Sequence, residues 1–320
     1  MSILHPEGFH GNGLTRRYFE GWYVKVVTAD RSRRWAFIPG LFLSNDGKAE
    51  AFIQVLDGVT AQTWFVAYPR EQFTALEDSF DARVGQSHFT SSGFTLEGAE
   101  LPLTGSVKFS PLTPWPVTRT SPGIMGWYAY VPFMECYHGV VSLHHTLTGE
   151  LTTKDGERVS LDGGVGYLEK DWGQAFPAGY VWMHSNTFAK SKACLIGSIA
   201  IIPWLFTSFP GFIVGLWIDG SLHRFATYTG AKSRRVTIGD THVKWELEDA
   251  KYLLTLTAER KRGGLLHAPV RTEMHRRVEE TLDSRIQVRL ADRKTGVVVF
   301  EDVGECAGLE VHGDTAKLSG

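Results

Sequence analysis

Short runs of alternating apolar and polar residues, separated by turn sequences, recur along most of this chain. Tyr18–Val27 alternates as a strand, ADRSRR forms a polar tip, and Trp35–Leu43 supplies the next strand. The sequence SNDGK follows, and its Asp-Gly pair is a strong hairpin signal. Residues 70–80 suggest a short helix, but helix signals are otherwise few. The pattern predicts an all-β protein, a barrel or a sandwich of many short strands.

Composition limits the partners of such a protein. The chain has 320 residues and a formal net charge of −2, so charge gives no reason to expect nucleic acid. Aromatic residues make up 12% of it, with ten Trp, which favours an apolar or ring-shaped ligand. Three scattered cysteines do not form a disulfide framework, and the first residues lack a signal-peptide pattern. We therefore expect a cytoplasmic setting.

One stretch, Ala193–Ile218, contains no charged residue and is long enough to span a bilayer. Its prolines and β-branched residues argue against a single membrane helix. We predict two buried strands, about 194–202 and 212–218, joined by the loop 203–211. Because the loop is rich in large apolar side chains, we expect peripheral contact with a membrane there.

The most informative stretch is Gly166–Phe188, which combines carboxylates, tryptophans, tyrosines, a histidine and an asparagine. If residues 167–172 form a strand, Tyr167, Glu169 and Asp171 share one face, since side chains alternate. A second strand, Tyr180–Phe188, follows a Pro-Gly turn, and the two are expected to form a hairpin lining a pocket. The run Tyr18–Trp22 echoes this stretch half a chain earlier and suggests a twofold repeat.

Several blocks together resemble the tocopherol cyclase family. They are YFEGWYVK at 18–25, MECYHGVVSLHH at 134–145 and GYLEKDWGQAFPAGYVWMHSNTF at 166–188, with weaker matches at 226–232 and 307–313. The resemblance implies two lipocalin-like β-barrel domains, which we place at 1–165 and 166–320, and a relation to carotenoid hydratases. It also implies cyclisation of a prenylated quinol to a chromanol without a redox or metal cofactor.

That reaction needs an acid to protonate an alkene, and a carboxyl group with a raised pKa meets the need. Asp171 is our first candidate, with Glu169 on the same face as its partner, because neighbouring carboxylates raise one pKa. Glu20 is the second candidate. The alternative is a buried ion pair with Lys170 or a nearby arginine that ties two domains together.

Aromatic faces stabilise carbocations, and polar groups orient a quinol. The substrate-binding residues that we predict are Trp22, Trp172, Tyr180, Trp182, His184, Asn186 and His138; each is equally compatible with a packed core. Cys136, His138, His144 and His145 match no closed zinc pattern, so we expect no metal. A non-catalytic lipocalin-like carrier of an isoprenoid, and a hydratase in which water replaces the phenol, are the rival interpretations.

Overall fold

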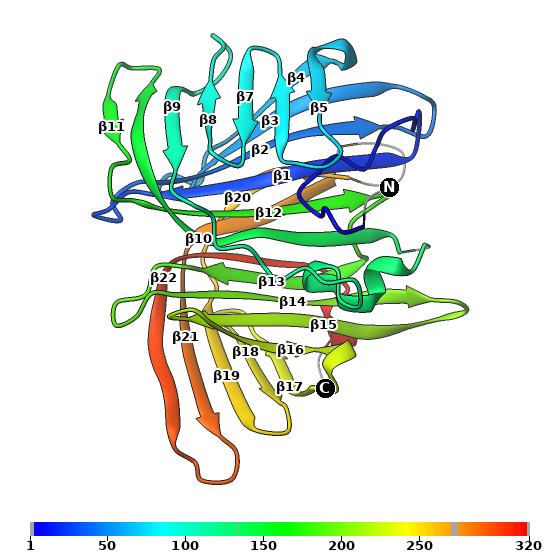
Figure 1. Ribbon diagram of the computed structural model, residues 1–320, viewed down its shortest axis with the longest axis vertical. Coiled ribbons are helices and arrows are strands. Elements are labelled where there is room, and N and C mark those ends of the chain that lie inside the picture. The colour runs from blue at the N-terminus through cyan, green and yellow to red at the C-terminus, as the bar shows by residue number, and fades with distance from the viewer. Residues whose placement is uncertain (1–2, 133, 270–273, 275, 319–320) are drawn as a thin grey trace. The chain divides into compact units, whose positions relative to one another are not determined.

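The computed structural model describes residues 3–132, 134–269, 274 and 276–318. The chain is all-β, as predicted, and forms two lipocalin-like units (Figure 1). The first comprises Met1–Phe176 and Leu265–Arg277, and the second Pro177–Gly264 and Val278–Gly320. The units therefore divide eleven residues after the expected boundary at 165, and one segment of the second half returns to the first unit.

The first unit is built on one strongly curved sheet. Its strand order is β4-β3-β2-β1-β12-β10-β9-β8-β7-β6-β5, with β11 pairing β10. The strands are β1 (Tyr18–Val27), β2 (Arg34–Leu43), β3 (Ala49–Asp57), β4 (Thr63–Pro69), β5 (Phe73–Ala75), β6 (Asp81–Val84), β7 (Ser87–Thr90), β8 (Gly93–Leu96), β9 (Leu103–Phe109), β10 (Cys136–Thr153), β11 (Arg158–Ser160) and β12 (Val165–Gly173). Two 3-10 helices, η1 (Arg70–Gln72) and η2 (Gly123–Tyr130), interrupt the connections.

Aromatic and branched side chains fill the inside of this sheet. The sheet curls back on itself, because β6 packs against β2 and β3. Trp22, Phe37 and Phe89 are fully buried in the resulting core. The N-terminal segment packs against one side of the core: the Trp22 indole donates to the Glu7 carbonyl (2.8 Å), and the Phe9 amide donates to the Leu76 carbonyl (2.7 Å). Side chains and the N-terminal segment thus occupy the space that an open barrel would leave for a ligand.

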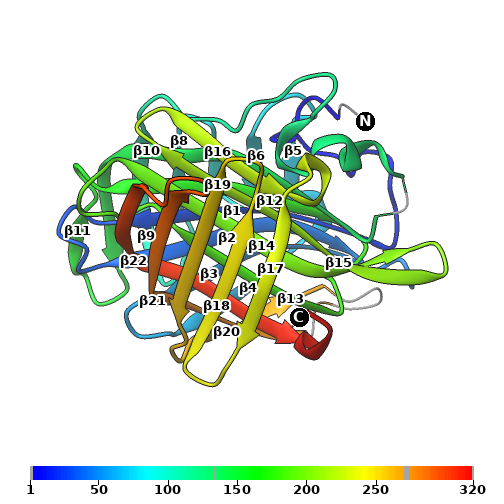
Figure 2. The same cartoon turned by 90° about the horizontal axis from the view of Figure 1, so that it is seen from below.

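The second unit is also built on one β-sheet and has a hydrophobic core of its own. Its strand order is β16-β15-β14-β13-β22-β21-β19-β18-β17, and β20 lies outside this path. The strands of this order are β13 (Gly179–Ser185), β14 (Ala193–Trp204), β15 (Thr207–Ile218), β16 (Ser221–Ala226), β17 (Lys232–Ile238), β18 (His242–Glu248), β19 (Tyr252–Glu259), β21 (Arg276–Asp292) and β22 (Val298–Gly313), with η3 (Thr227–Thr229) and η4 (Thr315–Leu318). All of β20 (Gly264–Ala268) except Gly264 belongs to the first unit. Figure 2 shows β17, β18 and β19 side by side.

Three local expectations were wrong. Residues 70–80 do not form one helix: only Arg70–Gln72 make a 3-10 turn, and Phe73 begins β5, which pairs with β6 and places Phe73 in the core. The stretch Gly166–Phe188 is not a hairpin, because β12 pairs with β1 and β10 whereas β13 pairs with β14 and β22. The segment 203–211 is mostly strand and turns only at Leu205 and Phe206.

Candidate functional site

Strand β12 separates two polar clusters by the alternation of its side chains. It lies between β1 and β10 (Figure 1), and both of its faces are largely buried. Leu168 and Trp172 belong to the first core, which defines the inner face. Glu169 and Asp171 therefore lie on the outer face, as the sequence predicts. The register places Asp171 directly opposite His138 of β10, and paired residues in antiparallel strands project to the same side.

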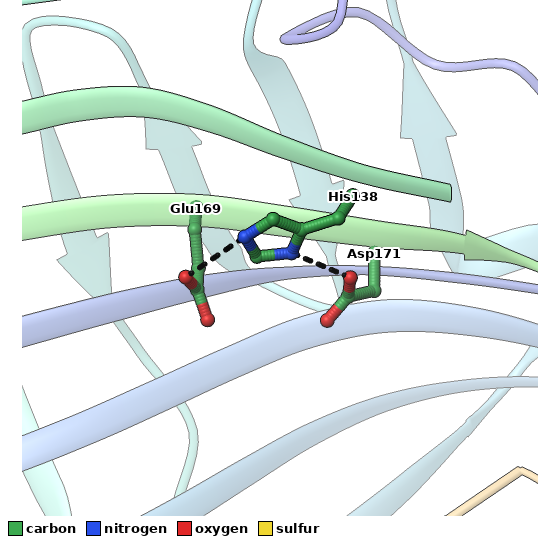
Figure 3. A group of neighbouring side chains, drawn as sticks. All are labelled: His138, Glu169 and Asp171. Carbon is green, nitrogen blue, oxygen red and sulfur yellow. Dashed lines mark hydrogen bonds and ion pairs between the residues drawn. The ribbon is translucent and has the colours of Figure 1, made fainter. Parts of the chain in front are cut away.

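His138 bridges the two carboxylates of the outer face. Its Nδ1 lies 2.8 Å from Oδ1 of Asp171, and its Nε2 lies 3.5 Å from Oε2 of Glu169. Figure 3 shows the imidazole ring between the two acids, with one nitrogen directed at each. The side chain of His138 is 12% exposed and that of Glu169 is 5% exposed, whereas that of Asp171 is 28% exposed. Asp171 is therefore the most accessible of the three.

The charges of this cluster fix its resting protonation. Burial alone would lower the pKa of His138, but Asp171 and Glu169 outweigh it and raise that pKa to about 9. The ring is therefore an imidazolium at neutral pH. The hydroxyl of the fully buried Tyr167 donates to Oε2 of Glu169 at 2.6 Å. The two carboxylates do not face each other directly, because the imidazolium of His138 lies between them.

The inner face of the same strand carries a second ionic cluster. Lys170 and Glu20 form an ion pair in which both side chains are 0% exposed. The Lys170 ammonium donates to Nδ1 of His10 at 2.9 Å and to the Gly8 carbonyl. It also lies over the rings of Trp22 (5.0 Å) and Trp172 (4.7 Å). The lysine is therefore fixed by one carboxylate, two aromatic faces and the N-terminal segment.

Glu20 is stabilised as a carboxylate. It accepts hydrogen bonds from the amides of His10 (3.0 and 2.9 Å) and Gly11 (3.1 Å), and from the Tyr18 hydroxyl. Burial alone would raise the pKa of Glu20, but Lys170 and His10 outweigh burial and lower it. The prediction of Glu20 as an acid is thus at odds with its environment, and the ion-pair alternative describes it. The pair joins two strands and the N-terminal segment of one unit.

Trp22 and Trp172 do not line the surface next to Asp171. Both side chains lie in the first core, on the inner face, where the His10 ring stacks on Trp172 at 4.4 Å. The sequence suggested that Trp172 flanks Asp171 because the two are neighbours in the chain. Neighbours in a strand project to opposite faces, so Trp172 lies on the face opposite Asp171, and substrate contact by either tryptophan stays a prediction.

The other predicted substrate contacts belong to β13 and the residues after it, in the second unit. Tyr180, Trp182 and His184 are buried and alternate with Val181 and Met183, which enter the second core. These three side chains therefore point away from that core. The Tyr180 hydroxyl donates to Oε2 of Glu310 at 2.5 Å. Asn186 is also buried and follows the strand.

An apolar surface beside the outer cluster was missed in the sequence. Phe19, Phe42 and Phe52 form a buried aromatic cluster, and Phe176 and Cys136 pack against it. The Sγ of Cys136 lies 4.0 Å from Oδ1 of Asp171, so this aromatic cluster borders the acid. The three phenylalanines come from three different strands, and only the pairing register brings them together.

The outer cluster also has the ligand types of a metal site. Ligand atoms of His138, Glu169 and Asp171 lie within 4.8 Å of one another, the one such group among the residues that the structure describes. Cys136, His144 and His145, considered with His138 in the sequence, are not part of it. Both nitrogens of His138 face carboxylates.

These features define an all-β, lipocalin-like protein with a half-buried histidine between two carboxylates beside an aromatic surface. Comparison with known proteins gives its family. The family model described as Tocopherol cyclase-like matches residues 88–313, and the chain belongs to that family. Among the described residues, we find no helix with the length and hydropathy needed to cross a membrane.

Two plant proteins are similar along nearly the whole chain. The probable chloroplastic tocopherol cyclase of Oryza sativa subsp. japonica is 23% identical, over 96% of this chain and 77% of its own length. The chloroplastic tocopherol cyclase of Zea mays is 21% identical over the same shares. The crystal structure of CghA matches with a TM-score of 0.58 at 12% identity, covering 92% of this chain and 88% of CghA. CghA with Sch210972 gives a TM-score of 0.59 at 11% identity over the same shares. The CghA matches establish the fold alone.

Proposed function

We propose that this protein is an enzyme that cyclises a hydrophobic, prenylated quinol-type substrate to a chromanol by protonating its alkene. The observation that carries the proposal is the half-buried His138, hydrogen-bonded to the accessible Asp171 and paired with Glu169. Family membership supports the substrate class, since the rice and maize relatives are named tocopherol cyclases.

Proton transfer begins when the ligand excludes water from the cluster. An apolar environment favours the neutral form of an ion pair, so the proton moves from Nδ1 of His138 to Oδ1 of Asp171. The neutral Asp171 then protonates the alkene, and the π bond becomes a tertiary carbocation. The phenol oxygen attacks the cation, forms the new C–O bond and loses its proton to Asp171. His138 takes that proton back, and the cycle is balanced without a cofactor.

The remaining groups support this transfer. Glu169, held by the Tyr167 hydroxyl, orients the imidazole and stabilises its charge at rest. The aromatic cluster of Phe19, Phe42 and Phe52 supplies an apolar surface next to the acid. Such a surface excludes water, which would otherwise add to the carbocation and give a hydrated product. Ring faces also stabilise positive charge.

The direct test is Asp171→Asn, assayed with a panel of prenylquinols. The change keeps the shape but removes the acid, so we expect kcat to fall at least about 100-fold with an unchanged melting temperature. A matched control is the surface pair of Asp81 and His88, in which Oδ1 of Asp81 lies 2.8 Å from Nε2 of His88. Asp81→Asn breaks a similar contact in the same unit and should leave kcat unchanged. Equal turnover by Asp171→Asn and the parent protein would remove Asp171 from the mechanism.

The same assay separates an enzyme from a carrier. A carrier would bind the quinol without converting it, and Asp171→Asn would then have no activity to lose. Turnover in deuterated water adds a second readout, because the proposed path places one solvent-derived deuterium on the former alkene carbon. Binding without product in the whole panel, together with unchanged ligand copurifying with the protein, would favour the carrier.

A further inference from the structure

The hairpin formed by β14 and β15 extends beyond the strands on either side of it. The register between β13 and β14 ends at Ala200, and the register between β15 and β16 begins at Ile213. From there to the turn, residues 201–211 form a two-stranded ribbon closed by the pairing of Trp204 with Thr207. Figure 2 shows this ribbon reaching past its neighbours in the sheet.

The end of this ribbon is apolar and exposed. We define the ribbon tip as Trp204, Leu205, Phe206 and Phe209. Phe206 is fully exposed and Leu205 is 76% exposed, while Trp204 and Phe209 are half-buried and contact each other edge to face at 6.1 Å. Exposed apolar residues are ordinary when scattered, but here they are gathered at the end of a projecting element.

The backbone conformation at the turn favours a residue other than leucine at position 205. Leu205 has φ +50°, in the left-handed region that glycine and asparagine adopt readily. A leucine in this conformation is strained relative to those residues, because its Cβ crowds the following carbonyl oxygen. Local stability and solubility would thus both favour a polar turn residue, and the chain has a large apolar one. A conflict of this kind points to a role outside the fold.

The small size of the ribbon tip and the absence of charged residues around it indicate what the tip contacts. Residues 193–218 carry no charged side chain, so insertion into hydrocarbon exposes no ionic group to it. The backbone groups on the facing sides of the two strands are paired across the hairpin, which lowers part of the cost of leaving water. Four side chains are too few for a stable protein interface, which buries roughly 800 Å² on each partner. They suit the interface of a lipid bilayer, where tryptophan, phenylalanine and leucine anchor peripheral proteins.

We propose that the ribbon tip inserts into the interfacial region of a phospholipid bilayer. The test is flotation of the full chain with phosphatidylcholine vesicles at low and high salt. We expect wild-type protein to float in both, because no charge at the tip depends on salt. The double variant Leu205→Asn/Phe206→Ser should reduce the bound fraction at least about tenfold, since two large apolar side chains are lost.

Two further measurements make the test specific. Val297→Ser/Val299→Ser removes two exposed apolar side chains near the start of β22 and should leave flotation unchanged. Leu205→Asn alone should melt at the same temperature as the wild type or higher, because asparagine relieves the turn, so reduced flotation is not caused by unfolding. The proposal is overturned if wild-type protein stays in the soluble fraction. It is equally overturned if the tip variant floats normally, or if the tip proves to hold a dimer that the variant dissociates.

Discussion

Replacing Lys170 by methionine isolates the structural role of the inner cluster. The change keeps the length of the side chain and leaves Glu20 as a buried carboxylate without its cation. Removing one partner of a fully buried pair costs about 3–5 kcal/mol. The amides of His10 and Gly11 still donate to Glu20, which favours the lower half of this range. For a unit of this size, about 3–4 kcal/mol lowers Tm by roughly 6–16 °C.

A double-mutant cycle separates the pair from general disruption. The single variants Glu20→Gln and Lys170→Met are compared with the double variant by urea unfolding of the first unit. Because the double variant contains no buried charge from the pair, we expect it to be more stable than the sum of the two losses predicts, by at least about 2 kcal/mol. Single losses below about 1 kcal/mol that simply add would refute the assignment of a buried ion pair.

The pH dependence of the protein's stability provides an independent check of the ion pair between Glu20 and Lys170. The pKa of Glu20 is lowered in the folded state, so its contribution to stability is present above the unfolded value of about 4.3. That contribution is lost as the pH falls through the folded pKa, when the carboxylate takes up a proton. Glu20→Gln should therefore flatten the acid limb of the stability curve. An acid limb that is the same in the variant and the parent would contradict the assignment.

Two further predictions concern the outer cluster. Because the folded pKa of His138 is about 9 and its unfolded value about 6.5, its contribution of about 3 kcal/mol is complete below pH 6.5 and lost as the pH rises through 9. Thermal unfolding against pH, with His138→Gln as the control, should show this loss only in the parent; equal curves would contradict it. Tyr167→Phe removes the donor to Glu169 and should cost about 1.5–3 kcal/mol. It should also move the NMR titration of His138 to higher pH, since a carboxylate that has lost its donor holds the imidazolium more strongly, and an unchanged midpoint would show that Tyr167 only packs.

The strand pattern predicted which side chains share a face, but it could not predict their partners. Alternation places Glu169 and Asp171 together because that rule acts within one strand. Their contact with His138 depends on the register between β10 and β12, which are joined by a long connection. Lys170 was named as a possible ion-pair partner from the sequence, but only the pairing of β1 with β12 brings it to Glu20. Pairing across a sheet is set by the packing of both strands, and a single sequence does not display that packing.

The ribbon shows a different limit of sequence interpretation. Pro203 and Pro210 suggested a loop, since proline lacks the N–H that a central strand needs. In the structure both lie in the two-stranded part of the hairpin, beyond the last pairs with β13 and β16, where only one side of each strand must be paired. The apolar character of 203–211 was visible in the sequence, but its exposure depends on where the neighbouring strands end.

Burial alone does not identify the acid of a site like this one. The sequence argument looked for a carboxyl whose pKa is raised, and it named Asp171 first and Glu20 second. Glu20 is more enclosed than Asp171, yet its pKa is lowered, because Lys170 and backbone amides offset the desolvation of its charge. Asp171 is more accessible, and its partner is a histidine that can hold or release a proton, whereas the partner of Glu20 is a lysine fixed between two indoles. A carboxylate can transfer a proton only if its partner can supply one and its oxygen can reach the ligand. On strand β12, Asp171 on the outer face satisfies both conditions. Lys170 on the inner face instead stabilises the fold through its ion pair with Glu20.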